Sequence, residues 1–151
     1  MDAEARLAGL GIALPETAAP KAMYVPAVRS GNLLFISGQL PSEGDALLTG
    51  LCGAERSLDE AVQGARRCAV NLLAAAKGQL GSLDRVRRVV KLQAFVASAP
   101  GFTSQHLVAN GASELLCAVF GESGRHARTA VAVPCLPLNA TVEIEAILEV
   151  E

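Results

Sequence analysis

The strongest constraint on this fold is a run of helical periodicity in the second quarter of the chain. Ser57 and Glu60 have the S-x-x-E spacing of a capping box, so a helix is predicted to begin at Leu58. Apolar residues then recur at intervals of three and four, at positions 61, 62, 65, 68, 69, 72, 73 and 76. Gly78 is expected to end this helix at about Lys77. A helix with one apolar face has to pack against another layer of structure.

A second helix is predicted from about Thr103 to Phe120, and Gly121 ends it. Gly111 weakens this helix in its middle. Its apolar stripe consists of positions 108, 112, 115, 116, 119 and 120. Residues 2–9 offer a third, short helical segment at the start of the chain.

The other regular segments have the pattern of strands. Residues 23–29 and 33–37 form a predicted hairpin, in which Pro26 places the first strand at a sheet edge. A weak strand is expected near residues 46–49, and stronger ones at 86–96, 127–133 and 141–150. In the strand over 86–96, alternation puts Val90 on the same face as Val86 and Leu92.

The order of these elements predicts a two-layer α+β fold, with a mixed six-stranded sheet and two helices on one face. Residues 1–151 are expected to form a single domain, with residues 1–20 as an N-terminal extension. Two helices leave one face of the sheet uncovered. The hydrophobic content of 51% suggests additional buried surface, such as an interface between subunits.

Charge and composition argue against several classes of protein. A net charge of −2 does not provide the basic surface that binds nucleic acid backbones. No apolar run approaches the roughly 18 residues that span a membrane. The charged first turn does not fit a signal peptide. None of the four cysteines lies in a CxxC pair, so we expect free thiols and a cytoplasmic location.

The sequence contains no phosphate-binding loop and no dinucleotide-binding glycine pattern. His106 and His126 are its only histidines, and several clustered histidines or cysteines are needed to bind zinc. We therefore predict that the protein does not bind a catalytic metal ion.

Arg128 is the most informative charged residue. It shares its strand face with Ala130 and Ala132, whose small side chains leave space in front of the guanidinium. A guanidinium presents a planar fork that matches a carboxylate. A solvated arginine at a strand edge, or one in a structural ion pair, would give the same pattern.

Glu143 and Glu145 lie on one face of the last predicted strand. A carboxylate beside a bound substrate can orient a water molecule or move a proton. The alternative is that both belong to a solvated polar face.

Three further side chains are candidates. Tyr24 could donate a hydrogen bond to a ligand or simply pack with its hydroxyl at the surface. His106 is expected near the first turn of the second helix and exposed. His126 precedes Arg128 by two positions, so it shares the face of Arg128 if the strand begins that early.

Three segments resemble one family in the same order along the chain. The first is the hairpin over residues 24–41, YVPAVRSGNLLFISGQLP. The second is GSLDRV over residues 81–86. The third is RTAVAV over 128–133, followed by LP at 136–137 and VEIE at 142–145. Together they resemble the RidA/YjgF family over about residues 20–151.

The resemblance implies a chorismate-mutase-like α+β domain that forms a homotrimer with clefts between subunits. It also implies hydrolysis of enamines and imines of the 2-aminoacrylate type to 2-keto acids and ammonia, without a cofactor. The expected ligand is a small 2-imino or 2-keto acid.

The motif positions of the family carry over to individual residues. The resemblance implies that Arg128 binds the substrate carboxylate and that Glu143 positions the attacking water. Tyr24 corresponds to the tyrosine of the opening strand, and Gly38 would keep the wall of the cleft thin.

The chain also departs from the family pattern. Ala130 stands where many members have cysteine, and His106 stands where many have asparagine, so that both positions line a changed pocket. The N-terminal extension and the segments NGASELL and GRHAR resemble a divergent branch.

Two other functions remain open at this point. One is a trimer that binds carboxylates or proteins without catalysis. The other is the endoribonuclease or translation inhibitor of older family labels. The acidic net charge and the single tyrosine count against the latter. The local basic cluster at positions 85, 87, 88 and 91 fits a solvated or interfacial role better than RNA binding.

Overall fold

The computed structural model describes residues 2–17, 19 and 22–151. In chain order the elements are α1 (Ala3–Gly9), β1 (Ala27–Ser30), β2 (Leu33–Gln39), β3 (Ser42–Glu43), β4 (Ala46–Leu47), α2 (Leu58–Leu80), β5 (Val86–Ala97), α3 (Gln105–Phe120), β6 (Ala127–Val133) and β7 (Val142–Val150). Short 3₁₀ turns lie at η1 (Leu83–Arg85), η2 (Gly121–Gly124) and η3 (Pro137–Asn139).

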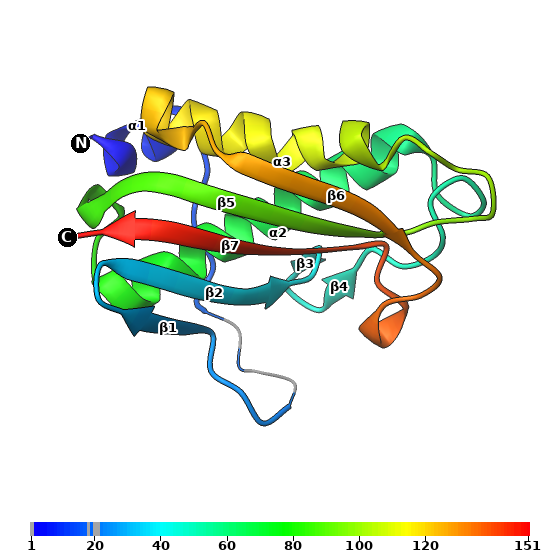
Figure 1. Ribbon diagram of the computed structural model, residues 1–151, viewed down its shortest axis with the longest axis horizontal. Helices are drawn as coiled ribbons and strands as arrows, with labels where there is room; N and C mark the ends of the chain where they lie inside the picture. The colour runs from blue at the N-terminus through cyan, green and yellow to red at the C-terminus, as the bar shows by residue number, and fades with distance from the viewer. Residues whose placement is uncertain (1, 18, 20–21) are drawn as a thin grey trace.

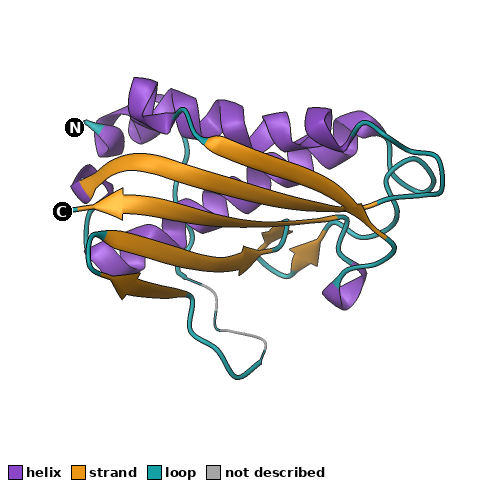
Figure 2. Ribbon diagram, in the orientation of Figure 1, coloured by secondary structure: helices purple, strands orange, loops and turns teal. Residues whose placement is uncertain are grey.

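A mixed sheet with the strand order β1-β2-β7-β5-β6 forms one layer, and helices α2 and α3 form the other (Figures 1 and 2). Strands β5 and β6 are parallel, because α3 connects them as a crossover, and the other neighbours are antiparallel. The α+β fold and its two layers are therefore confirmed.

One detail of the predicted architecture is wrong. The main sheet has five strands rather than six, because β3 and β4 pair only with each other as a separate two-stranded ribbon. The short helix predicted at 2–9 is present as α1, and it packs against α3 and η1.

The capping box of α2 is present as predicted. The Glu60 amide donates to Ser57 Oγ at 3.1 Å, and the Ser57 amide donates to Glu60 Oε1 at 3.4 Å. The helix does not end at Gly78, however. It continues to Leu80 and ends at Gly81, whose φ of 82° is the left-handed conformation of a C-terminal cap.

Gly78 serves a different purpose inside α2. A Cβ atom at this position would lie 2.6 Å from Thr17 Oγ1, so the glycine allows the segment at Thr17 to approach the helix closely. Thr17 Oγ1 also donates to the Ala74 carbonyl at 3.1 Å. Nearer the N-terminus, Glu4 pairs with Lys77 at 2.8 Å, and this pairing lowers the Glu4 pKa.

Gly111 allows the two long helices to pack against each other. A Cβ atom there would collide with the Val62 carbonyl oxygen and would lie 3.2 Å from the Arg66 amide nitrogen. The residue that weakens α3 locally is therefore the one that permits its contact with α2.

The predicted face of β5 is partly wrong. Register shifts between Val86 and Arg88, and between Val89 and Lys91, interrupt the simple alternation. As a result Val89, which is fully buried, faces the helices in place of Val90.

The face of the sheet opposite the helices is open in the described chain, as predicted (Figure 1). Val28, Phe35 and Val131 lie on it and are 53%, 43% and 39% exposed. A depression of about 240 Å³ lies across β1, β2, β5 and β7 on this face, which we call the open face. No helix in the described segments is both long and apolar enough to cross a membrane.

Candidate functional site

Strand β7 places Glu143 on the open face of the sheet. Val142 and Ile144 on either side of it are fully buried under the helices, so alternation turns Glu143 and Glu145 to the opposite side. The predicted shared face of the two glutamates is confirmed. Glu143 is half-buried, whereas Glu145 is exposed.

Gly38 holds the Glu143 side chain through close contact. A Cβ atom on Gly38 would collide with Glu143 Oε1 and would lie 2.9 Å from its Cδ. The pairing of β2 with β7 is also irregular here, between Ile36 and Gln39. Any larger residue at position 38 would therefore displace the carboxylate.

The Glu143 carboxylate is poised to accept a proton. Burial raises its pKa above the ordinary value, and the nearby charge of Glu145 raises it further. All four ion pairs in the described part of the chain involve other residues. A half-buried carboxylate with a raised pKa and free oxygen atoms suits a general base or a water-orienting group.

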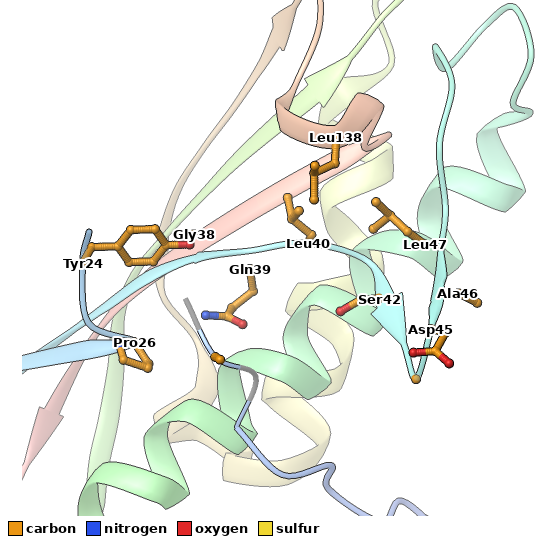
Figure 3. A pocket seen from close by; sticks show the side chains of 12 residues that line it. Tyr24, Pro26, Gly38, Gln39, Leu40, Ser42, Asp45, Ala46, Leu47 and Leu138 are labelled. Atoms are coloured by element: carbon orange, nitrogen blue, oxygen red, sulfur yellow. The ribbon is translucent and has the colours of Figure 1, made fainter. Parts of the chain in front are cut away.

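A cavity of about 300 Å³ lies beside Gly38 (Figure 3). Tyr24 lines it, and its hydroxyl points toward the backbone at Gly38. Leu40, Leu47 and Leu138 form an apolar wall at the other end. Glu143 does not line this cavity, but Gly38 touches both. We call Tyr24, Gly38 and Glu143 the carboxylate region.

The backbone at the apolar end of the cavity is unusual. Leu138 and Asn139 have φ values of 59° and 60°, a conformation that bulky residues rarely adopt. The Gly50 amide donates to the Asn139 carbonyl at 3.0 Å, and Thr141 Oγ1 donates to the Gly50 carbonyl at 2.8 Å. These contacts tie the turn to the loop at Gly50, and the Leu138 side chain lines the cavity with 58% of its surface exposed.

Arg128 lies on the other face of the sheet. Its partner in the β5–β6 ladder is Leu92, which is fully buried under the helices, so the arginine side chain points toward α3. The space expected in front of it, beside Ala130, is filled by α3. Arg128 Nη1 donates to Asn110 Oδ1 at 2.8 Å and to Ser113 Oγ at 3.2 Å.

The main chain of α3 completes the contacts of the guanidinium. Arg128 Nη2 donates to the His106 carbonyl at 2.9 Å. His106 thus reaches Arg128 through its backbone, while its side chain is exposed, as the sequence predicted. Ala130 packs against the core as a partly buried residue.

Sequence reasoning missed Asn110 and Ser113 and did not give His126 a role. His126 Nε2 lies 2.9 Å from Ser113 Oγ, and its Nδ1 lies 2.6 Å from the Gly124 carbonyl oxygen. The two segments NGASELL and GRHAR were the available signal, because they contain all of these residues. We call Asn110, Ser113, His126 and Arg128 the guanidinium region.

The two regions do not meet within one chain. Glu143 pairs with Phe95 in the register of β7 and β5, and both face away from the helices. Arg128 pairs with Leu92, which faces toward them. The structure therefore brings Tyr24 and Gly38 to Glu143, and it brings the main chain at His106 to Arg128, but it separates the two sets by the thickness of the sheet.

Among the described residues, no group of three or more histidine, cysteine, aspartate or glutamate side chains could hold a metal ion. All four cysteines are free, and Cys52 and Cys68 are buried. The cytoplasmic location inferred from these thiols stays a prediction.

The mixed sheet with two helices packed on one face makes this a small two-layer α+β protein. The family model described as "YjgF/chorismate mutase-like, putative endoribonuclease" matches residues 4–150. The chain therefore belongs to the YjgF family, as its motifs indicated.

Individual relatives agree with this assignment. The chain is 50% identical to the protein TCP17 of Trypanosoma cruzi over 147 residues, which cover 96% of this chain and 92% of the relative. A "putative endoribonuclease" from Shewanella oneidensis superposes with a TM-score of 0.96 at 31% identity, over 99% of this chain and all of the other. RidA from an Antarctic Psychrobacter species superposes with a TM-score of 0.64 at 30% identity, over 89% and 94% of the two chains.

Proposed function

We propose that this protein hydrolyses small reactive enamines and imines of the 2-aminoacrylate type to 2-keto acids and ammonia. The observation that carries the proposal is the Glu143 carboxylate, which is half-buried against Gly38, has a raised pKa and takes part in no ion pair of the described chain. Membership of a family that includes a structure named RidA supports it.

The proposed chemistry needs few protein groups. A protonated imine is already electrophilic, so the protein has to hold the substrate, place a water molecule and assist the movement of its proton. Glu143 would orient that water and take up a proton from it. Arg128 would bind the substrate carboxylate, and the Tyr24 hydroxyl would contact the ligand from the side of Gly38.

We further propose that each complete site forms between two subunits of a homotrimer. Arg128 and Glu143 of one chain lie on opposite faces of its sheet, so one substrate would contact both only if they came from different chains. The exposed Val28, Phe35 and Val131 on the open face would supply apolar contact area for such an assembly.

The direct test measures the release of ammonia and keto acid from freshly generated 2-aminoacrylate. Wild-type protein is expected to accelerate this release, and Arg128→Ala and Glu143→Gln should each lose most of the acceleration. If the wild type does not accelerate it, the proposed reaction is wrong.

The arrangement across subunits has a separate test. Co-expression of the inactive variants Arg128→Ala and Glu143→Gln should restore about a quarter of the wild-type activity, because random mixing leaves that share of sites with both groups intact. A site within one chain would stay inactive in every mixture. Light scattering that finds a monomer would also contradict the proposal.

A carboxylate-binding trimer without catalysis is the second candidate, and the anchored guanidinium of Arg128 favours it. Calorimetry with 2-oxobutyrate that shows binding, together with an inactive deaminase assay, would identify this function. The basic cluster gives less support to RNA cleavage, because Arg85 Nη1 is bound to the Leu80 carbonyl at 2.8 Å.

A further inference from the structure

The contacts of Arg128 form a continuous hydrogen-bonded chain from the end of η2 to the guanidinium. His126 joins the Gly124 carbonyl to the Ser113 hydroxyl, and Ser113 joins His126 to Arg128. Asn110 Oδ1 accepts from the same Nη1 atom of Arg128 at 2.8 Å. Three segments of the fold therefore converge on one side chain.

The Gly124 carbonyl determines which atoms carry the protons in this series of hydrogen bonds. A carbonyl oxygen can only accept, so Nδ1 of His126 carries a proton and donates it to Gly124. In the neutral ring Nε2 is then an acceptor, and it accepts from the Ser113 hydroxyl. The hydroxyl oxygen of Ser113 is left to accept from Arg128.

The same contacts leave one edge of the guanidinium free. Of the five N–H groups of an arginine, Nη1 uses two and Nη2 uses one in these bonds. Within the described residues the remaining two, on Nε and Nη2, have no acceptor. Nε and Nη2 share one edge of the guanidinium, and such an edge can bind a carboxylate through two parallel hydrogen bonds.

We propose that Asn110, Ser113 and His126 are positioning residues that orient Arg128 so that its Nε–Nη2 edge faces the carboxylate of the ligand, and that this orientation requires neutral His126. The proposal rests on the proposed function in one respect, namely that Arg128 binds the carboxylate. It adds how that arginine is held and what would release it.

Protonation of His126 would disturb these hydrogen bonds at Ser113. Both ring nitrogens would then be donors, so Ser113 Oγ would accept from Nε2 as well as from Arg128, and the Ser113 hydroxyl would lose the acceptor for its own proton. The positive ring would also face the guanidinium. Burial and the charge of Arg128 lower the His126 pKa, although the bond to Gly124 acts in the opposite direction.

The other groups around His126 do not offset the repulsion between a protonated His126 ring and the Arg128 guanidinium. From α3 it faces the uncharged side chain of Ser113, and from β6 it faces the cation of Arg128. In η2, Glu122 pairs with Arg125 at 3.6 Å, and both side chains are largely exposed. Glu114 of α3 is exposed as well.

The first measurement is the affinity for 2-oxobutyrate by calorimetry as a function of pH. Ser113→Ala is expected to raise Kd by at least about tenfold, the effect of losing one hydrogen bond to a charged group. His126→Phe should weaken binding at every pH. His126→Gln offers an amide oxygen to Ser113 and does not titrate, so it should bind like wild type near neutrality and resist the loss of affinity that wild type shows on acidification.

The second measurement follows the Nε–H resonance of Arg128 by NMR without ligand. In wild type its motion should increase as His126 is protonated. In Ser113→Ala and His126→Phe the Arg128 side chain should already be mobile at neutral pH, so its Nε–H resonance should be averaged over several orientations. Glu114→Gln is the matched control on the same helix, and it should change neither the resonance nor the affinity. Circular dichroism of each variant checks that it folds.

The outcomes separate this proposal from the proposed function. If Ser113→Ala and His126→Phe leave the Arg128 resonance unchanged, the positioning role is overturned, whatever the catalytic assay shows. If they mobilise Arg128 but wild type releases no ammonia from 2-aminoacrylate, the positioning role stands and the proposed reaction is wrong.

Discussion

The carboxylate region and the guanidinium region differ in how fully their polar groups are satisfied. Three hydrogen bonds from α3 hold Arg128, two of them from side chains. Glu143 is positioned mainly by packing against Gly38, and desolvation leaves its charge less stable. The comparison teaches that one half of the proposed site is fixed before a ligand arrives, while the other keeps its hydrogen-bonding capacity for water and substrate.

The largest effect is expected from Gly38→Ala, which would break the carboxylate region alone. The new methyl group would push the Glu143 carboxylate out of place, and a shift of about 1 Å at a reacting group can reduce kcat/KM about 100-fold. The deaminase assay measures this loss, and 2-oxobutyrate binding through Arg128 should change far less. Gly9→Ala is the matched control, because a Cβ atom there meets nothing within 4 Å and its backbone is helical. Equal activity of Gly38→Ala and wild type would contradict this geometry.

Gly111→Ala should disturb the guanidinium region by displacing α3 relative to α2. A methyl group at position 111 would collide with the α2 backbone and push α3 away from it, which we expect to cost about 1–3 kcal/mol of the free energy of unfolding. Denaturant unfolding measures the cost. Because α3 carries Asn110 and Ser113, the affinity for 2-oxobutyrate should fall in the same variant. A stable variant with unchanged affinity would show that α3 does not control Arg128.

The smallest effects are opposite pH dependences of stability. Folding raises the Glu143 pKa, so its favourable contribution is complete below about pH 4.5 and is lost as pH rises through the raised value. Glu143→Gln should therefore be more stable than wild type at neutral pH. Chemical denaturation at several pH values measures this, and an unchanged stability would mean that the carboxylate is not desolvated.

His126 should give the opposite pH dependence of the free energy of unfolding. Its pKa is lowered by folding, so its contribution is complete above about pH 6.5 and is lost as pH falls through the lowered value. His126→Gln should consequently lose less stability than wild type on acidification below pH 6.5. A parallel decline of the two proteins would argue against a neutral ring in the folded state.

Local patterns in the sequence were sufficient for much of this structure. The capping box at Ser57 and Glu60 located the start of α2, and alternation in β7 placed Glu143 and Glu145 on one face. These features depend on residues close together in the chain, where helix and strand periods apply directly.

Features that depend on contacts between distant segments were not predictable in this way. Alternation assigns faces within one strand, but it does not say which face of β6 corresponds to which face of β7, so the separation of Arg128 from Glu143 was open. The irregular register of β5 moved Val89 into the core, and the contact of Ser113 with His126 depends on how α3 packs beside β6. Gly78 and Gly111 resembled helix breakers because the sequence does not show the backbone that approaches each of them.

The three bonds that hold Arg128 also limit how this position can evolve. Lysine would preserve the positive charge, but its ammonium group has only three donors, and Asn110, Ser113 and the His106 carbonyl offer three acceptors. A lysine that satisfied all of them would have nothing left for a ligand. The most conservative replacement by charge would therefore remove the two N–H groups that the guanidinium keeps for a carboxylate.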